Sequence, residues 1–80
     1  QDGFFTDIDA KGACLQGTTF RRMNLKCTDF GGADLTDAVF DDVSIEGAIF
    51  KGVVIGNTLF SKMHAYGREI EEFHPEKWNC

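Results

Sequence analysis

The chain has 80 residues, of which 42% are hydrophobic, and its formal net charge at pH 7 is −5 with a pI near 4.7. This negative charge disfavours binding to nucleic-acid phosphates and to anionic membranes. No apolar run is long enough to span a bilayer as a helix, so we expect no direct membrane insertion.

The strongest pattern is a large apolar residue at every fifth position from Leu15 to Phe60. A period of five matches neither a helix, at about 3.6, nor a flat strand, at about 2. The chain must therefore turn after each unit of five. We call the residues at this position, counted back to Phe5, the centres. They are Phe5, Ala10, Leu15, Phe20, Leu25, Phe30, Leu35, Phe40, Ile45, Phe50, Ile55 and Phe60.

The positions that flank each centre have their own preferences. The residue two before a centre is small or β-branched, with Met23 as the bulky exception. The residue two after a centre is Gly or Asn at positions 12, 17, 32, 47, 52 and 57. That residue would be third in a type II turn, where φ must be positive. We expect other turn geometries where Asp7, Arg22, Cys27, Asp37, Asp42 and Lys62 stand.

These units resemble the pentapeptide-repeat family, whose pattern is a small residue, Asp or Asn, Leu or Phe, and two polar residues. Ala33-Asp34-Leu35-Thr36-Asp37 matches this pattern in full, and Thr28-Asp29-Phe30-Gly31-Gly32 nearly does. The resemblance covers about residues 3 to 62. It implies an all-β solenoid, a right-handed four-sided β-helix of about three coils. We therefore expect a repeat domain at residues 1–62.

With four units per coil, residues 20 apart should stack. The centres then form two phenylalanine columns and two columns that are mainly aliphatic, with Ala10 interrupting one phenylalanine column. Rings separated by one coil, about 4.8 Å, can stack with an offset. On the outside, Arg21 should lie next to Asp41. Asp29 and Asp34 occupy the polar position of the family pattern, and we interpret them as structural ligands of turn backbone.

The segment at 63–80 should cover the end of the solenoid. Met63, Tyr66, Ile70 and Phe73 form a stripe at helical spacing. Ser61 is a possible N-cap and Pro75 ends the stripe. We therefore expect a C-terminal capping α-helix from Met63 to Phe73 over the last coil, with Trp78 packed nearby.

The three cysteines cannot all pair within one chain. Cys14 and Cys27 should project from opposite sides of a coil, beyond the Cα separation of about 7 Å that a disulfide allows. Two readings remain for Cys80: a free thiol, or a disulfide to Cys27. The disulfide would imply an oxidising compartment.

The sequence offers few candidates for chemistry. His64, His74 and Cys80 do not have the spacing of a zinc site. Asp37, Asp41 and Asp42 are better explained as solvated turns than as a calcium site. No catalytic constellation or phosphate loop is present, and a packed solenoid offers no cleft. We therefore predict a non-enzyme with no catalytic residue, metal or cofactor.

The residue just before each centre departs from the family pattern in the later repeats. Early repeats carry polar residues there, whereas the later ones carry Val39, Ile49, Val54 and Leu59. These side chains should face outward. They are either strand-like filler or an interaction surface for a protein partner.

Two functions follow from the resemblance. The first is a rigid acidic module that docks onto a larger protein assembly. Members of the family are abundant in cyanobacteria and chloroplasts, so the resemblance implies the lumenal side of a photosynthetic membrane complex, in the thylakoid lumen. A cytoplasmic location is the alternative. A start at Gln1 inside the repeat, with no signal peptide, indicates processing or a larger parent chain.

The second function is mimicry of DNA. Quinolone-resistance pentapeptide proteins resemble duplex DNA in shape and charge and inhibit type II topoisomerases. Three coils would rise only about 15 Å, less than half of a duplex turn of about 34 Å. We therefore favour the protein-docking function.

Overall fold

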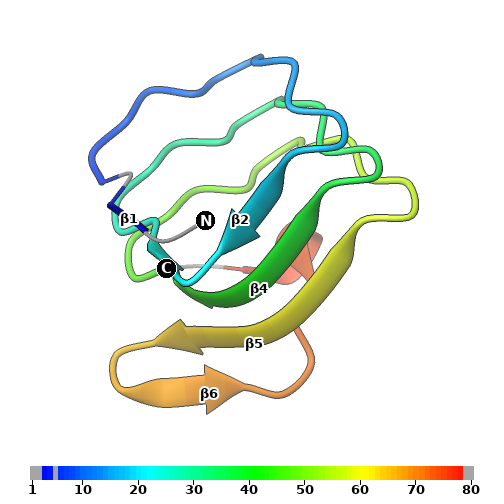
Figure 1. Ribbon diagram of the computed structural model, residues 1–80. Helices are drawn as coiled ribbons and strands as arrows, with labels where there is room; N and C mark the ends of the chain where they lie inside the picture. Colours follow the sequence, from blue (N-terminus) through cyan, green and yellow to red (C-terminus); the bar gives the residue numbers. More distant parts are fainter. Residues whose placement is uncertain (1–2, 5, 79–80) are drawn as a thin grey trace.

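The computed structural model describes residues 3–4 and 6–78 of the chain. Its elements are β1 (Gly3–Phe4), β2 (Thr19–Arg21), β3 (Met23–Asn24), β4 (Val39–Ser44), β5 (Leu59–Ala65), β6 (Arg68–Ile70) and the 3₁₀ helix η1 (Pro75–Lys77). Figure 1 shows the chain passing round in stacked layers, from the blue N-terminal part to yellow β5. We call residues 3–22 the first layer, 23–42 the middle layer and 43–62 the last layer.

Residues 20 apart in the sequence lie side by side, as predicted. The parallel strand pairs join Gly3 to Met23, Thr19 to Val39, and Val39 to Leu59. Isolated bridges with the same offset join Asp9, Asp29 and Ile49, and likewise Cys14, Asp34 and Val54. Pairing therefore recurs once in each pentapeptide, and the sheet wraps round the layers. The handedness of the winding stays a prediction.

The core is built from the predicted columns of centres. Phe20 stacks on Phe40 with ring centroids 4.6 Å apart, and Phe40 stacks on Phe60 at 5.2 Å. The other phenylalanine column stacks Phe30 on Phe50 at 5.1 Å. Rings of the two columns meet edge-on, with 6.0 Å between Phe30 and Phe40. Stacked and edge-on pairs both suit the quadrupole of the ring, so the two columns pack favourably against each other.

Turn geometry departs from the sequence-based expectation. Glycines at the turn position have positive φ as predicted, for example 70° at Gly32. The residues for which we expected other geometries also have positive φ, between 53° and 63°: Asp7, Arg22, Cys27, Asp37, Asp42 and Lys62. The expectation was therefore wrong for φ. Stacking on the neighbouring layer imposes the same sign of φ at each corner, whichever residue stands there. Asp tolerates this conformation better than most residues.

The predicted capping helix is wrong, since Met63–Phe73 contains no helix in the structure. Instead β5 continues past the last layer to Ala65, with Val43 paired to Met63 and Ser44 to His64. Ser61 lies within β5 and caps no helix. The edge of β4 offers backbone partners to this segment, and these ladder bonds outweigh a helical stripe of four residues. Pro75 begins η1 rather than ending a helix.

A hairpin forms the first part of the cap. Tyr66 and Gly67 both have positive φ, at 54° and 74°, which is the requirement of a two-residue type I′ turn. The turn leads into β6, which pairs antiparallel with β5 and places Ile70 opposite Met63. Phe73 then packs edge-on against Phe50 and Phe60, with centroids 5.1 and 4.9 Å away. β5 thus crosses the predicted domain boundary between residues 62 and 63.

In the part of the chain that the structure describes, no helix has the length and hydrophobicity to cross a membrane.

Candidate functional site

The outward acids of the repeat bind turn backbone, as predicted. Asp29 Oδ1 accepts a hydrogen bond of 2.8 Å from the amide of Gly31. Asp34 Oδ1 accepts bonds from the Thr36 hydroxyl at 2.6 Å and the Thr36 amide at 3.1 Å. These bonds, the hydroxyl first, hold the pKa of Asp34 below its usual value of 3.8. Both acids therefore serve the fold and are not free for chemistry.

One charged pair joins the first and middle layers, and another joins the middle layer to the part of β5 beyond the last layer. Arg21 Nε lies 3.2 Å from Asp41 Oδ2, which confirms the predicted neighbours. Asp42 Oδ1 lies 2.7 Å from Nε2 of His64. Both pairs are solvent-exposed, and pairs of this kind contribute little, about 0–1 kcal/mol.

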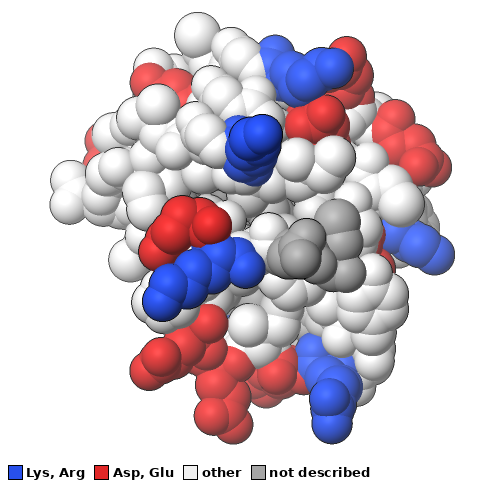
Figure 2. All heavy atoms as spheres, turned by 180° about the vertical axis from the view of Figure 1, so that it is seen from behind, with Lys and Arg blue, Asp and Glu red and all other residues white. Residues whose placement is uncertain are grey.

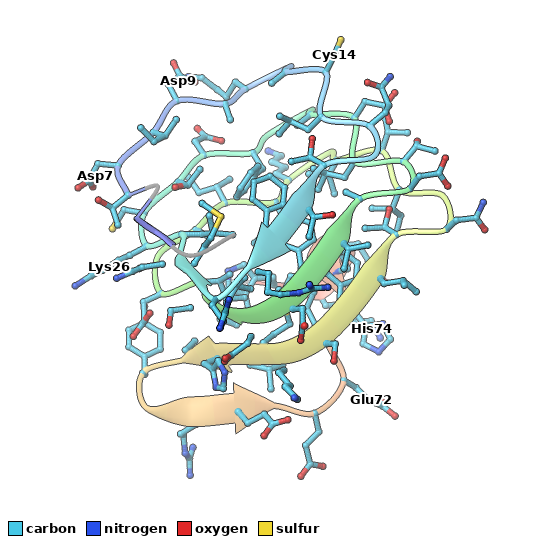
Figure 3. The ribbon with its side chains drawn as sticks, viewed as in Figure 1. Asp7, Asp9, Cys14, Lys26, Glu72 and His74 are labelled. Atoms are coloured by element: carbon cyan, nitrogen blue, oxygen red, sulfur yellow. The ribbon has the colours of Figure 1, made fainter. Side chains whose placement is uncertain are left out.

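The candidate metal ligands are separated in space. His64 contacts Asp42, whereas His74 lies between Glu72 and Glu76 in the cap, at 3.7 and 3.9 Å. Figure 3 shows His74 and Glu72 close together below the yellow strand β5. Among the described residues, no three His, Cys, Asp or Glu side chains are grouped closely enough to hold a metal ion.

The described cysteines are exposed free thiols. Cys14 and Cys27 are not bonded to each other, as predicted. Cys14 lies on the first layer and projects into solvent (Figure 3). Cys27 occupies a turn and lies beside Gly47 of the last layer, where a Cβ would come within 3.0 Å of its Sγ. The proposed disulfide partner, Cys80, lies outside the described residues.

The four predicted interaction residues do not form one patch. Val39 pairs with Leu59 on one side of the solenoid, where Val39 is half-buried and Leu59 is 60% exposed. Ile49 and Val54 are also exposed, but each precedes a different centre and continues a different column of bridges. The structure thus brings Leu59 and Val39 together and places Ile49 and Val54 on other sides.

The sequence did not predict the exposure of Ile55. This centre stands above Leu35, which is fully buried, and yet 46% of Ile55 is exposed. Two adjoining hollows open here, of about 490 and 240 Å³, and both are lined by Phe50, Gly52, Pro75 and Glu76. The signal in the sequence was the end of the repeat: Phe60 is the last centre, so the repeat provides no centre twenty residues after Ile55 to cover it.

Acidic side chains are frequent on the cap, by which we mean residues 63–78. Glu69, Glu71, Glu72 and Glu76 belong to β6, η1 and the segment between them. Figure 2 shows Asp and Glu clustered at the lower end of the molecule, with basic side chains beside them. The hollows next to Ile55 are therefore bordered by an acidic end.

Comparison with protein families finds one match, to the family described as pentapeptide repeats. Eight copies of the repeat are found, and the matched segments are residues 5–42 and 13–52. A search of curated proteins finds no match. No solved structure matches the chain either. The repeat, the pairing of residues 20 apart and this match agree: the chain belongs to the pentapeptide-repeat family, whose repeats build β-helical structural modules rather than enzymes.

Proposed function

We propose that the chain is a protein-interaction module, a rigid acidic solenoid that docks onto a larger protein assembly through the outer surface of its last layer. The observation that carries the proposal is the exposure of Val54, Ile55 and Leu59, at 51%, 46% and 60%. Val54 and Leu59 precede successive centres on adjoining sides, and Ile55 is a centre that the last layer leaves exposed. Large apolar side chains exposed at a surface are typical of interaction sites.

The contrast with the middle layer supports this choice of surface. There the corresponding positions are Asp34, Leu35 and Val39, which are half-buried, fully buried and half-buried. Val54 thus replaces the structural acid Asp34 in the layer where the solenoid ends. Covering them would contribute about 1.5–3 kcal/mol for each side chain that becomes fully buried.

The finer parts of the proposal rest on the family. We propose a right-handed, four-sided winding, a location in the thylakoid lumen and a photosynthetic membrane complex as the assembly. A cytoplasmic location is the alternative. The net charge of −5 fits a protein surface as partner better than it fits nucleic acid or an anionic lipid surface.

The test is purification of the native assembly with a tagged chain, followed by identification of the proteins that co-purify. Val54→Asp with Leu59→Asp should reduce partner recovery strongly, because a loss of about 3 kcal/mol lowers affinity by about a hundredfold. Ile8→Asp is the matched control, since Ile8 is exposed on the first layer. If the two variants recover the same amount of partner, the last layer is not the docking surface.

DNA mimicry is the less favoured function. The longest dimension of the molecule is 28 Å, shorter than one duplex turn of about 34 Å. An assay of DNA supercoiling decides the matter, and potent inhibition by this chain would favour mimicry over docking.

A further inference from the structure

Each layer holds the next through a fixed set of backbone hydrogen bonds. On the side of Leu15, the amide of Gly12 donates to Gly31 O at 2.9 Å, and the carbonyl of Ala13 accepts from the amide of Asp34 at 2.9 Å. The amides of Leu15 and Gly17 donate to Asp34 O and Thr36 O, both at 2.9 Å. The edge of a layer that faces the next layer along the chain thus presents three amides and one carbonyl.

The middle layer presents the same four groups to the last layer. The amides of Gly32, Leu35 and Asp37 donate to the carbonyls of Lys51, Val54 and Gly56, at 2.8–2.9 Å. The carbonyl of Ala33 accepts from the amide of Val54 at 2.8 Å. The pattern is therefore a property of the repeat and not of one pair of layers.

In the last layer the equivalent groups are the amides of Gly52, Ile55 and Asn57 and the carbonyl of Val53. Within residues 6–78, none of these four groups has a hydrogen-bond partner. From the cap, Trp78 Nε1 donates to the carbonyl of Ala48 at 2.9 Å, on the neighbouring side. An unpaired sheet edge of this kind is a ready template for another strand.

The space beside this edge is open as far as Ile55. The two hollows follow the edge from Ala48 to Ile55. Their far wall is Pro75 and Glu76 of η1, and η1 makes no backbone bond to the edge among the described residues. At the floor lies Ile55, whose counterpart Leu35 is covered by the layer above it.

We propose that the open edge from Gly52 to Asn57 binds an extended segment of a partner protein, which adds to the solenoid as one more parallel strand. The segment supplies three carbonyls and one amide in the spacing that residues 51–56 present to residues 32–37. Strand addition of this kind draws its affinity from main-chain bonds and its specificity from alternate side chains.

The layer beneath also defines the side chains of the segment. Its third residue should be small or β-branched, like Ala33 and Val53, and its fifth should be aliphatic, like Leu35 and Ile55. The chain's charge of −5 and the carboxylate of Glu76 favour flanking basic residues. The partner is thus a short, extended, basic-flanked segment with an aliphatic anchor over Ile55. This inference rests on the proposed function and names the mode of docking.

The probe is a synthetic peptide, Lys-Lys-Gly-Gly-Ala-Asp-Leu-Thr-Lys-Lys. Its central residues copy 31–36, which make the required four bonds to the first layer. We expect the amides of Gly52, Ile55 and Asn57 to exchange with solvent about tenfold more slowly when the free peptide is at about ten times its Kd. Amide exchange followed by NMR on the full chain measures this.

Two N-methylated peptides form a matched pair. Methylation of the peptide's Asp amide removes the bond to Val53 O and blocks close approach, so protection should be lost. Methylation of its Leu amide should have no effect, because the equivalent amide of Leu35 points to the opposite edge and bonds to Val54 O. Binding that does not distinguish the two peptides would overturn the proposal.

Variants of the chain give a second pair. Ile55→Lys removes the apolar seat of the peptide and should abolish protection, whereas Ile8→Lys on the first layer should not. If the three amides are protected without peptide and in proportion to protein concentration, a second copy occupies the edge and the proposal is wrong. If the edge fails to bind the peptide while Val54→Asp with Leu59→Asp still releases the native partner, the docking function stands, and strand addition at this edge is wrong.

Discussion

The middle layer and the last layer carry the same repeat but differ in what covers them. In the middle layer, Leu35 and Phe40 are fully buried because a complete layer lies above and below. In the last layer, Phe50 is covered by Phe73 of the cap, while Ile55 is not. The repeat therefore places a residue with positive φ at every corner, and the neighbouring layer decides which centres become core.

The largest expected difference lies in the phenylalanine columns. Phe40→Ala removes a ring that stacks on both Phe20 and Phe60, and we expect it to lower the free energy of unfolding by about 3–5 kcal/mol. Phe60→Ala should cost clearly less, because Phe60 is only half-buried. Urea unfolding followed by circular dichroism measures both. Equal costs would mean that the cap is as well packed as a layer.

The column of Leu15, Leu35 and Ile55 gives a sharper comparison, because Leu35 is covered by both neighbouring layers and Ile55 by only one. Leu35→Ala should lower the free energy of unfolding by about 2–5 kcal/mol, the range of buried Leu→Ala changes. Ile55→Ala, in the same column, should cost less than half as much because the side chain is largely exposed. The same unfolding experiment applies. A cost at Ile55 equal to that at Leu35 would indicate that the hollow is closed in solution.

Substitutions at the turn glycines should change the free energy of unfolding by less, and they report on contact between layers. Gly12→Ala and Gly47→Ala both place a Cβ at positive φ, which costs about 1–2 kcal/mol. At Gly47 the new Cβ also meets Cys27 Sγ at 3.0 Å, whereas nothing lies within 4 Å at Gly12. We expect Gly47→Ala to cost more, and Cys27→Ala to remove the excess. Thermal unfolding of the single and double variants checks this, and an excess that survives Cys27→Ala would contradict it.

The smallest effect is the pH dependence of Asp34. Because its folded pKa is below the usual 3.8, its hydrogen bonds contribute stability above that pH. This contribution is lost as the pH falls through the lower folded pKa. Asp34→Asn keeps an oxygen for Thr36 and should flatten the dependence in this window. Urea midpoints from pH 5 down to pH 2 would show it, and unchanged curves would place the acid sensitivity elsewhere.

The sequence predicted most of the solenoid, because stacking by twenty follows from the period and from four units per round. The columns of Phe20 and Phe30, the positive φ of Gly32 and the turn bonds of Asp29 and Asp34 were all predicted. The interaction role of Val39, Ile49, Val54 and Leu59 stays a prediction. Val39 and Leu59 lie together, and Ile49 and Val54 lie on other sides, because one repeat position visits every side in turn.

The cap could not be predicted from its own residues. Met63, Ile70 and Phe73 fit a helix in the sequence, and they pack towards the core in the structure, but through a hairpin and a turn. The competing strand required a partner in β4, twenty residues earlier, which local spacing does not reveal. Gly67 was a local signal against the helix, because glycine weakens a helix. In the structure its positive φ suits the hairpin turn.

The sequence by itself determined the period, the inward columns and the corners at Gly and Asn, because these depend on residues that repeat at fixed spacing. Only the tertiary structure decided where the repeat stops being covered. Burial of Ile55 and pairing of the Gly52–Asn57 edge depend on what lies above the last layer, and that is set by the path of β5, β6 and η1. Among the described residues, that path leaves four backbone groups of this edge without a hydrogen-bond partner and Ile55 exposed.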